Sequence, residues 1–197
     1  MHISEGVLSG PVLLSGAALA VVGTGIGLKR LDYDRIARAG MLSACFFVAS
    51  LIHVPVGPSS AHLVLNGIVG LILGWGAFPA ILVALILQAA FFQFGGLTTL
   101  GVNTVIMALP AVIGYIALRP LIRKGGKWSI AAGFACGFLA VLLSALLVAA
   151  ALIFTREDFF AVSWMLIAAN FPVMVIEGIV TAFCATFFLK VKPELLT

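Results

Sequence analysis

Long apolar runs separated by short polar linkers make up most of this chain. A helix that crosses a membrane needs about 20 apolar residues, with about 17–25 the usual range. Two polar linkers interrupt the runs, KRLDYDRIARA at 29–39 and RPLIRKGGK at 119–127. The pattern therefore predicts an all-α integral membrane protein with about seven transmembrane helices, at residues 7–28, 40–55, 61–76, 78–94, 103–119, 128–154 and 162–189.

The composition agrees with a membrane protein and excludes a soluble one. Of the 197 residues, 63% are hydrophobic and 9% are charged, whereas soluble proteins are about half apolar and a quarter charged. There are too few polar residues to cover a soluble surface. No internal repeat divides the chain, so we expect residues 1–197 to form a single multi-pass domain in the lipid bilayer of a cell membrane. The first residues, MHISEGVLSGP, lack the basic start and cleavage site of a signal peptide.

The basic residues predict the orientation of the helices. Lys and Arg are concentrated in cytoplasmic loops, and seven alternating helices place ten of them on one side and only Arg156 on the other. The amino terminus is then outside and the carboxyl terminus cytoplasmic. We attribute the net charge of +4 to this topology, and expect no nucleic-acid partner. The ten are Lys29, Arg30, Arg35, Arg38, Arg119, Arg123, Lys124, Lys127, Lys190 and Lys192.

Two irregular segments are predicted on the outer side, PVGPSS at 55–60 and GGLTTLGVNT at 95–104. Non-helical backbone at membrane depth survives where it is buried in protein or lines a cavity. We expect the two segments to enter the bundle and cover a pocket near the outer surface; ordinary surface turns are the alternative.

Chemistry concentrates on three histidines, His2, His53 and His62, all predicted at the outer face. The Met1 amine, the deprotonated amide nitrogen of His2 and His2 Nδ1 are able to hold one metal in fused five- and six-membered rings. A fourth nitrogen, from His62 or His53, completes a square. Planar nitrogen ligation favours Ni(II) or Cu(II), whereas Zn(II) prefers a tetrahedron.

Retention of Met1 is expected, because methionine removal requires a small second residue and histidine is large. An amine with a pKa of about 8 and an imidazole with a pKa of about 6.5 release their protons when a metal competes near neutrality. Such a site loses its metal on acidification. A histidine without a ligand role, held by hydrogen bonds, is the alternative for each single position.

Three separated motifs, MHISEG at 1–6, VPVGPSSAHLVLNG at 54–67 and GGLTTLGVNT at 95–104, resemble those of NikM and CbiM, the nickel and cobalt substrate-binding subunits of energy-coupling factor transporters. The resemblance implies a substrate-binding component that captures Ni(II) or Co(II) outside. It implies a transmembrane T-component and cytoplasmic ATPases as partners, with a small accessory membrane subunit as a further candidate. It also implies metal ligands at Met1, His2 and His62. The amino-acid sequence of the second motif resembles the nickel-binding members more than the cobalt-binding ones.

Several further residues are predicted near the metal. We expect His53 to contact a ligand and not the metal itself, with direct ligation as the alternative. Ser59, Ser60 or Asn103 is expected to orient a ligating imidazole. We expect Glu5 to anchor the N-terminal segment. For Asn103 a helix N-cap is one interpretation; in the other it joins Thr98 and Thr99 in tying the loop over the metal.

Glu177 is a carboxylate near the middle of a predicted helix, far from the predicted metal. A structural bond to a broken helix is the favoured interpretation, and a transport step is the alternative. We treat Gln88 and Gln93 in the same way. Small residues at four-residue spacing, Gly16 with Ala20 and Gly40 with Ala44, indicate either docking of the T-component or packing within the bundle.

The chain has no nucleotide-binding fingerprint, so we expect a transporter subunit without its own ATPase, cofactor or catalytic residues. The three cysteines lack metal-ligand spacing and are expected to be packing residues. Two rival functions are a membrane metalloenzyme and a proton-coupled carrier. An enzyme needs an open coordination position and a nearby base, and a carrier typically has paired ionisable residues or repeated broken helices. Neighbouring genes for ATPases and a T-component would contradict both rivals.

Overall fold

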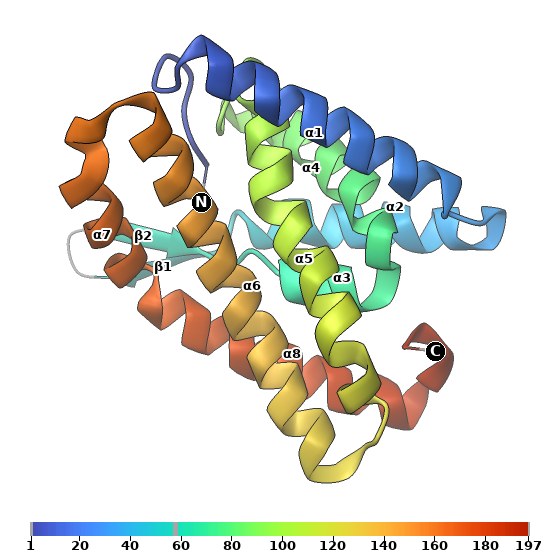
Figure 1. Ribbon diagram of the computed structural model, residues 1–197. Helices are drawn as coiled ribbons and strands as arrows, with labels where there is room; N and C mark the ends of the chain where they lie inside the picture. Colours follow the sequence, from blue (N-terminus) through green and yellow to red (C-terminus); the bar gives the residue numbers. More distant parts are fainter. Residues whose placement is uncertain (1, 57–58, 197) are drawn as a thin grey trace.

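The computed structural model describes residues 2–56 and 59–196, with the side chains of Asp34, residues 53–62 and Glu157 outside the description. The described chain is predominantly helical, as expected, but it also contains one two-stranded antiparallel sheet (Figure 1). The elements are α1 (Gly10–Lys29), α2 (Tyr33–Ala49), β1 (His53–Val56), β2 (Ser59–His62), α3 (Asn66–Leu73), α4 (Ala77–Phe92), α5 (Leu100–Ile122), α6 (Gly126–Thr155), α7 (Phe160–Ala169) and α8 (Phe171–Val191), with short 3₁₀ turns at Gly74–Gly76, Glu157–Phe159 and Pro193–Leu195.

The expected boundaries of three helices were wrong. The helix predicted over 40–55 runs instead from Tyr33 to Ala49, and residues 53–56 and 59–62 form two paired strands, called the hairpin below, because Pro55 lacks the N–H that a helix needs. The helix predicted over 61–76 begins only at Asn66. The helix predicted over 162–189 is divided at Asn170, where Pro172 begins a new helix.

Five helical segments of the described chain are long and apolar enough to cross a membrane, fewer than the seven expected. They are Gly10–Lys29, Asn66–Phe92, Leu100–Ile122, Gly126–Thr155 and Phe171–Val191. The second of these joins α3 and α4, which a turn at Gly74–Gly76 separates. The helix α2 has 17 residues and falls just below the length required.

The short helix α3 runs parallel to α5. Asn66 Nδ2 donates to the carbonyl of Met107 at 3.3 Å, and the backbone at Gly70 lies against Ala111. A Cβ on Gly70 would lie 2.1 Å from the Ala111 carbonyl oxygen, so the contact requires glycine. The chain from the hairpin through α3 therefore runs in the same direction as α5, and α4 runs in the opposite direction.

The helix α6 is antiparallel to both of the long helices that pack against it, α5 and α8. Ser144 Oγ of α6 donates to the carbonyl of Ile106 at 2.8 Å, and Gly114 approaches Cys136, so α5 and α6 are antiparallel. Gly133 packs on Ala182 and Gly137 on Glu177, which makes α8 antiparallel to α6. Close glycine contacts thus fix the α5–α6–α8 core.

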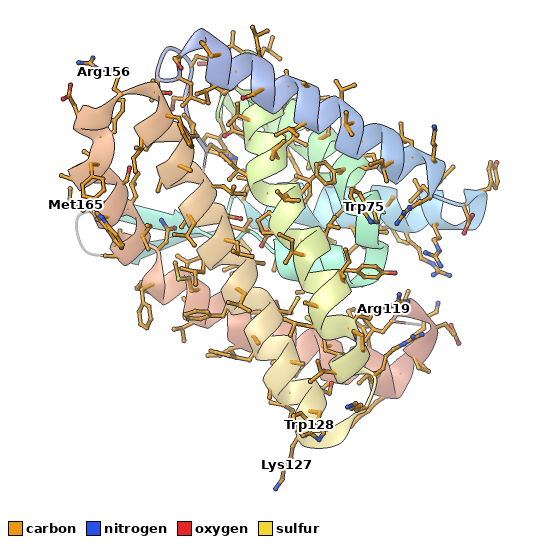
Figure 2. All side chains as sticks on the ribbon, viewed as in Figure 1. Trp75, Arg119, Lys127, Trp128, Arg156 and Met165 are labelled. Carbon is orange, nitrogen blue, oxygen red and sulfur yellow. The ribbon has the colours of Figure 1, made fainter. Side chains whose placement is uncertain are left out.

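Basic residues gather at one end of the bundle. Figure 2 shows Arg119, Lys127 and Trp128 near the α5–α6 turn, and Arg156 at the opposite end. Arg119 Nε donates to the carbonyl of Leu196 at 2.9 Å, which ties the carboxyl end to α5. Arg119 and Lys127 thus lie at the end opposite Arg156 (Figure 2), and the orientation of the two ends in a membrane stays a prediction.

The two small-residue pairs have different environments. Gly16 and Ala20 are buried, and a Cβ on Gly16 would lie 2.3 Å from the side chain of Val102, so this pair packs inside the bundle. Gly40 and Ala44 on α2 are exposed. Internal packing is therefore the correct interpretation for the first pair, and the docking role of the second stays a prediction.

Candidate metal site

The N-terminal segment enters the bundle and is held there by Asn103. The Ile3 N–H donates to Asn103 Oδ1 at 3.0 Å, and Asn103 Nδ2 donates back to the Ile3 carbonyl at 3.1 Å. Both residues are buried. Asn103 lies inside α5, which begins at Leu100, so it binds the terminal segment and is not an N-cap. One side chain thus satisfies both backbone groups of the residue next to His2.

Thr99 supports this amide. Asn103 Nδ2 donates to Thr99 Oγ1 at 3.2 Å, and the Thr99 hydroxyl donates to the carbonyl of Gly96 at 3.4 Å. Thr99 is 1% exposed. The hydroxyl therefore connects the start of α5 to the turn before it, as expected of a tie in this loop.

Glu5 joins the terminal segment to the turn at 95–98. Its N–H donates to the Gly95 carbonyl at 3.1 Å, and its Oε1 accepts from the Thr98 N–H at 3.1 Å. Gly96 has a φ of +134°, and a Cβ there would lie 2.0 Å from Glu5 Cγ. Glycine is required at this position for both reasons, and Glu5 has the anchoring contacts that the sequence predicted.

The imidazole of His2 is oriented by Gln88. His2 Nε2 lies 2.8 Å from Gln88 Oε1, and Gln88 is fully buried in α4. With Gln88 Oε1 as the acceptor, Nε2 carries the ring hydrogen and Nδ1 the lone pair, which is the tautomer that the predicted chelate needs. Phe94 contacts the same ring edge to face, with centroids 6.0 Å apart. Gln88 and Phe94 together orient the imidazole.

The hairpin brings two other histidines into register. The backbone of His53 is paired with that of His62 across the two strands, where sequence analysis predicted the ends of two helices. Ser59 and Ser60 belong to β2 and pair with Val56 and Pro55. The side chains of these four site residues, and Met1 altogether, lie outside the described part of the structure.

Their roles at a metal, like that of His2, stay predictions. Among the side chains that are described, no group of three His, Cys, Asp or Glu residues is placed to hold a metal ion.

Gln88 has a larger role here than the sequence indicated. It lies in an apolar helix 86 positions from His2, and nothing in its local pattern connects the two. The available signal was chemical: a buried glutamine in a membrane helix requires a partner, and a ligating histidine requires an acceptor behind it.

Comparison with known proteins identifies the family of this chain. A profile described as the cobalt uptake substrate-specific transmembrane region, CbiM, matches residues 2–195. The chain belongs to the CbiM family. The resemblance noted in the sequence is thereby confirmed, and the protein is a substrate-specific transmembrane component of cobalt or nickel uptake and not an enzyme.

Relatives of this CbiM-family chain come from several prokaryotes. A protein of Haemophilus influenzae with a metal-transport description is 41% identical over 199 residues, covering 100% of this chain and 97% of the relative. The cobalt transport protein CbiM of Sorangium cellulosum is 30% identical, covering 100% and 94%. The fused nickel transport protein NikMN of Rhodobacter capsulatus is 34% identical over 131 residues, covering 64% and 38%.

Two solved structures share the fold of this CbiM-family chain. One, titled as a transition metal transporter, superposes with a TM-score of 0.77 at 24% identity and covers 99% of this chain and 93% of that one. The other, a truncated transition metal transporter, has a TM-score of 0.74 at 23% identity and covers 98% and 99%. The apolar helices and the family profile indicate a multi-pass membrane protein.

Proposed function

We propose that this CbiM-family chain captures Ni(II) at its amino-terminal segment for uptake into the cell, with Co(II) as the second candidate substrate. The observation that carries the proposal is the position of His2. Two contacts fix the segment around His2. Asn103 bonds to the backbone of Ile3, the next residue, and Gln88 bonds to Nε2 of the His2 ring. A histidine fixed in this way loses little freedom when it binds a metal.

Four nitrogens form the proposed site. In a chain that starts at Met1 they are the Met1 amine, the His2 amide nitrogen, His2 Nδ1 and an imidazole nitrogen of His62. The first three nitrogens come from one short segment and would chelate the metal together. A role of this kind fits the firm attachment of the segment to the bundle. A planar set of this kind suits Ni(II) or Cu(II) better than Zn(II), which prefers tetrahedral sites, so of the two metals named for this family it favours Ni(II).

The hairpin supplies the fourth ligand and its support. His53 is the cross-strand partner of His62, and such pairs are close neighbours in a sheet. We therefore assign His53, with Ser59 and Ser60, to orienting His62. The short ladder gives His62 a more defined position than an isolated loop would.

The charge distribution supports an orientation in the membrane. The basic end of the bundle, with Arg119 and Lys127 (Figure 2), lies on the cytoplasmic side by the positive-inside rule. Counting the hairpin with α3 as one crossing, and α2 as another, gives seven alternating passes with the terminal site outside. The chain then acts as one unit in the cytoplasmic membrane of a prokaryote.

Energy for uptake comes from partners. We propose a transmembrane T-component and cytoplasmic ATPases, as in energy-coupling factor systems, because a site that holds metal outside has to be opened by work done elsewhere. The fused nickel relative has a further region beyond the part that matches this chain. This supports a small accessory membrane subunit as an additional partner.

Calorimetry of Ni(II) binding to the purified, untagged protein tests the proposal. His62→Ala is expected to lower the affinity by more than the about 10–100-fold that supporting residues contribute. His53→Ala serves as the matched histidine variant and should stay within that range. Unchanged affinity in His62→Ala would contradict the assignment of the fourth ligand.

A further inference from the structure

Glu177 of α8 is a fully buried carboxylate that bonds to the backbone directly after the hairpin. Its Oε1 accepts from the N–H groups of Val64 and Leu65, the latter at 2.8 Å. These residues connect β2, which ends at His62, to α3, which begins at Asn66. The predicted bond to a broken helix is therefore present, and it lies two and three residues beyond a proposed metal ligand.

The turn needs an acceptor at this place. Leu65 has a φ of +55°, a left-handed conformation that is rare for a leucine, and it gives α3 no side-chain cap. Backbone N–H groups at a helix start lack partners within the helix, and a carboxylate there is favoured by the helix dipole. Neither ion pair found among the described residues, Arg35 with Asp32 or Arg156 with Asp158, involves Glu177. The backbone N–H groups are thus its observed partners.

The carboxylate is attached to a closely packed part of the bundle. A Cβ on Gly137 of α6 would lie 2.2 Å from the Glu177 carbonyl oxygen, and a Cβ on Gly67 of α3 would lie 3.0 Å from the Gly137 Cα. The helices α3, α6 and α8 therefore meet at Glu177 with little room to shift. A side chain fixed in this way is able to hold the turn in one position.

We propose that Glu177 is a positioning residue, which sets the place of His62 by holding the backbone of Val64 and Leu65. This inference rests on the proposed function, because it gives Glu177 a role only if His62 binds the metal. A planar site depends strictly on where its fourth nitrogen lies. The filled d shell of Zn(II) imposes no planar geometry, so a displacement of His62 lowers the affinity for Ni(II) more than the affinity for Zn(II).

The test compares three substitutions in the full-length protein. Glu177→Asp withdraws the acceptor by one methylene, Glu177→Leu removes it, and Glu177→Gln keeps an acceptor oxygen at the same reach. Thr181→Val is the matched control, one turn further along α8 and also fully buried. Affinities for Ni(II) and for Zn(II) are measured by calorimetry on each variant, and thermal unfolding is followed alongside.

We expect Glu177→Asp and Glu177→Leu to lower the Ni(II) affinity by about 10–100-fold and the Zn(II) affinity by less. Glu177→Gln should restore most of the Ni(II) affinity, and Thr181→Val should match the wild type. Unchanged Ni(II) affinity in both weakened variants would overturn the proposal. So would equal losses for both metals that follow the loss of thermal stability, because a purely structural role predicts that result.

The same series separates this inference from the proposed function. If His62→Ala weakens Ni(II) binding and the Glu177 variants do not, only the positioning role is wrong. If His62→Ala binds Ni(II) as tightly as the wild type, the proposed ligand set is wrong, and the positioning role of Glu177 is then wrong as well.

Discussion

The His2 ring lies 2.8 Å through Nε2 from Gln88 Oε1, and in the proposed site this contact leaves Nδ1 for the metal. Gln88 Oε1 accepts from His2 Nε2, which leaves Nδ1 to close the six-membered chelate ring with the His2 amide. The terminal site therefore depends on a residue in the middle of α4 as well as on the terminus.

Replacement of Gln88 tests that dependence. Gln88→Leu removes the acceptor, and we expect Ni(II) affinity to fall by about 10–100-fold, as for other partners of ligating histidines. Gln88→Glu keeps an acceptor oxygen and should retain most of the affinity. The measurement is a Ni(II) titration by calorimetry. Equal affinity in the Leu variant would show that Gln88 does not orient the ring.

Gly96 tests the docking of the terminal segment. An alanine at this position would place its Cβ 2.0 Å from Glu5 Cγ and would have to adopt a φ of +134°. Gly96→Ala should therefore expose the N-terminal residues, seen as faster proteolysis or faster hydrogen exchange there, and should weaken Ni(II) binding. Gly126→Ala is the control, since Gly126 also has a positive φ of +57° but nothing lies within 4 Å of its Cβ. Equal protection in both variants would contradict this docking.

At the scale of elements, the apolar pattern predicted where helices lie better than where they end. The two polar linkers contain the turns from α1 to α2 and from α5 to α6, but α2 begins at Tyr33, inside the first linker. The other errors lie at Pro55, before Asn66 and at Asn170, where the chain is still apolar but the helix stops. Hydropathy does not distinguish a helix from a strand or a turn inside the bundle, whereas proline and glycine positions do.

The same limit applies to the site. The sequence identified Glu5, Thr99 and Asn103 through their place in short motifs, and the structure joins all three to the terminal segment or its turn. The sequence pattern could not place His53 opposite His62, because that pairing depends on strand register. It also could not connect Gln88 to His2 or Glu177 to Val64. The Gln88–His2 and Glu177–Val64 contacts join residues 86 and 113 positions apart, and local pattern contains no information on them.

The packing of α3 on α5 gives a prediction at this scale. Gly70→Ala would force its Cβ to within 2.1 Å of the Ala111 carbonyl oxygen, and overpacking of this kind costs about 1–3 kcal/mol. We expect a lower midpoint of thermal unfolding in detergent. Gly25→Ala, on the exposed face of α1 with nothing within 4 Å, should leave the midpoint unchanged or raise it slightly. Equal midpoints for the two variants would contradict the close approach of these helices.

For the whole molecule, the charge separation between the two ends and the buried terminal segment have to act together. The metal is proposed at one end, and the partners that supply energy are proposed at the basic end. The helix α8, with Glu177 in its middle and the Arg119–Leu196 contact beyond its carboxyl end, connects the two. Uptake therefore depends on the geometry of the terminus and not only on metal affinity.

An extension of the terminus separates uptake from affinity. One residue placed before Met1 moves the histidine to the third position, where an amine, two amides and the imidazole fill all four planar positions without His62. We expect such a variant to bind Ni(II) but to fail in cellular nickel uptake, measured as accumulated metal. Normal uptake by the extended chain would contradict a role for the Met1 amine.

The most direct test of the central claim is an X-ray absorption spectrum of Ni(II) bound to the purified, untagged protein. The account predicts four nitrogen ligands in a square plane, with one imidazole lost in His62→Ala and the planar geometry lost in His2→Ala. A six-coordinate or tetrahedral spectrum, or a planar spectrum unchanged in His2→Ala, would contradict it.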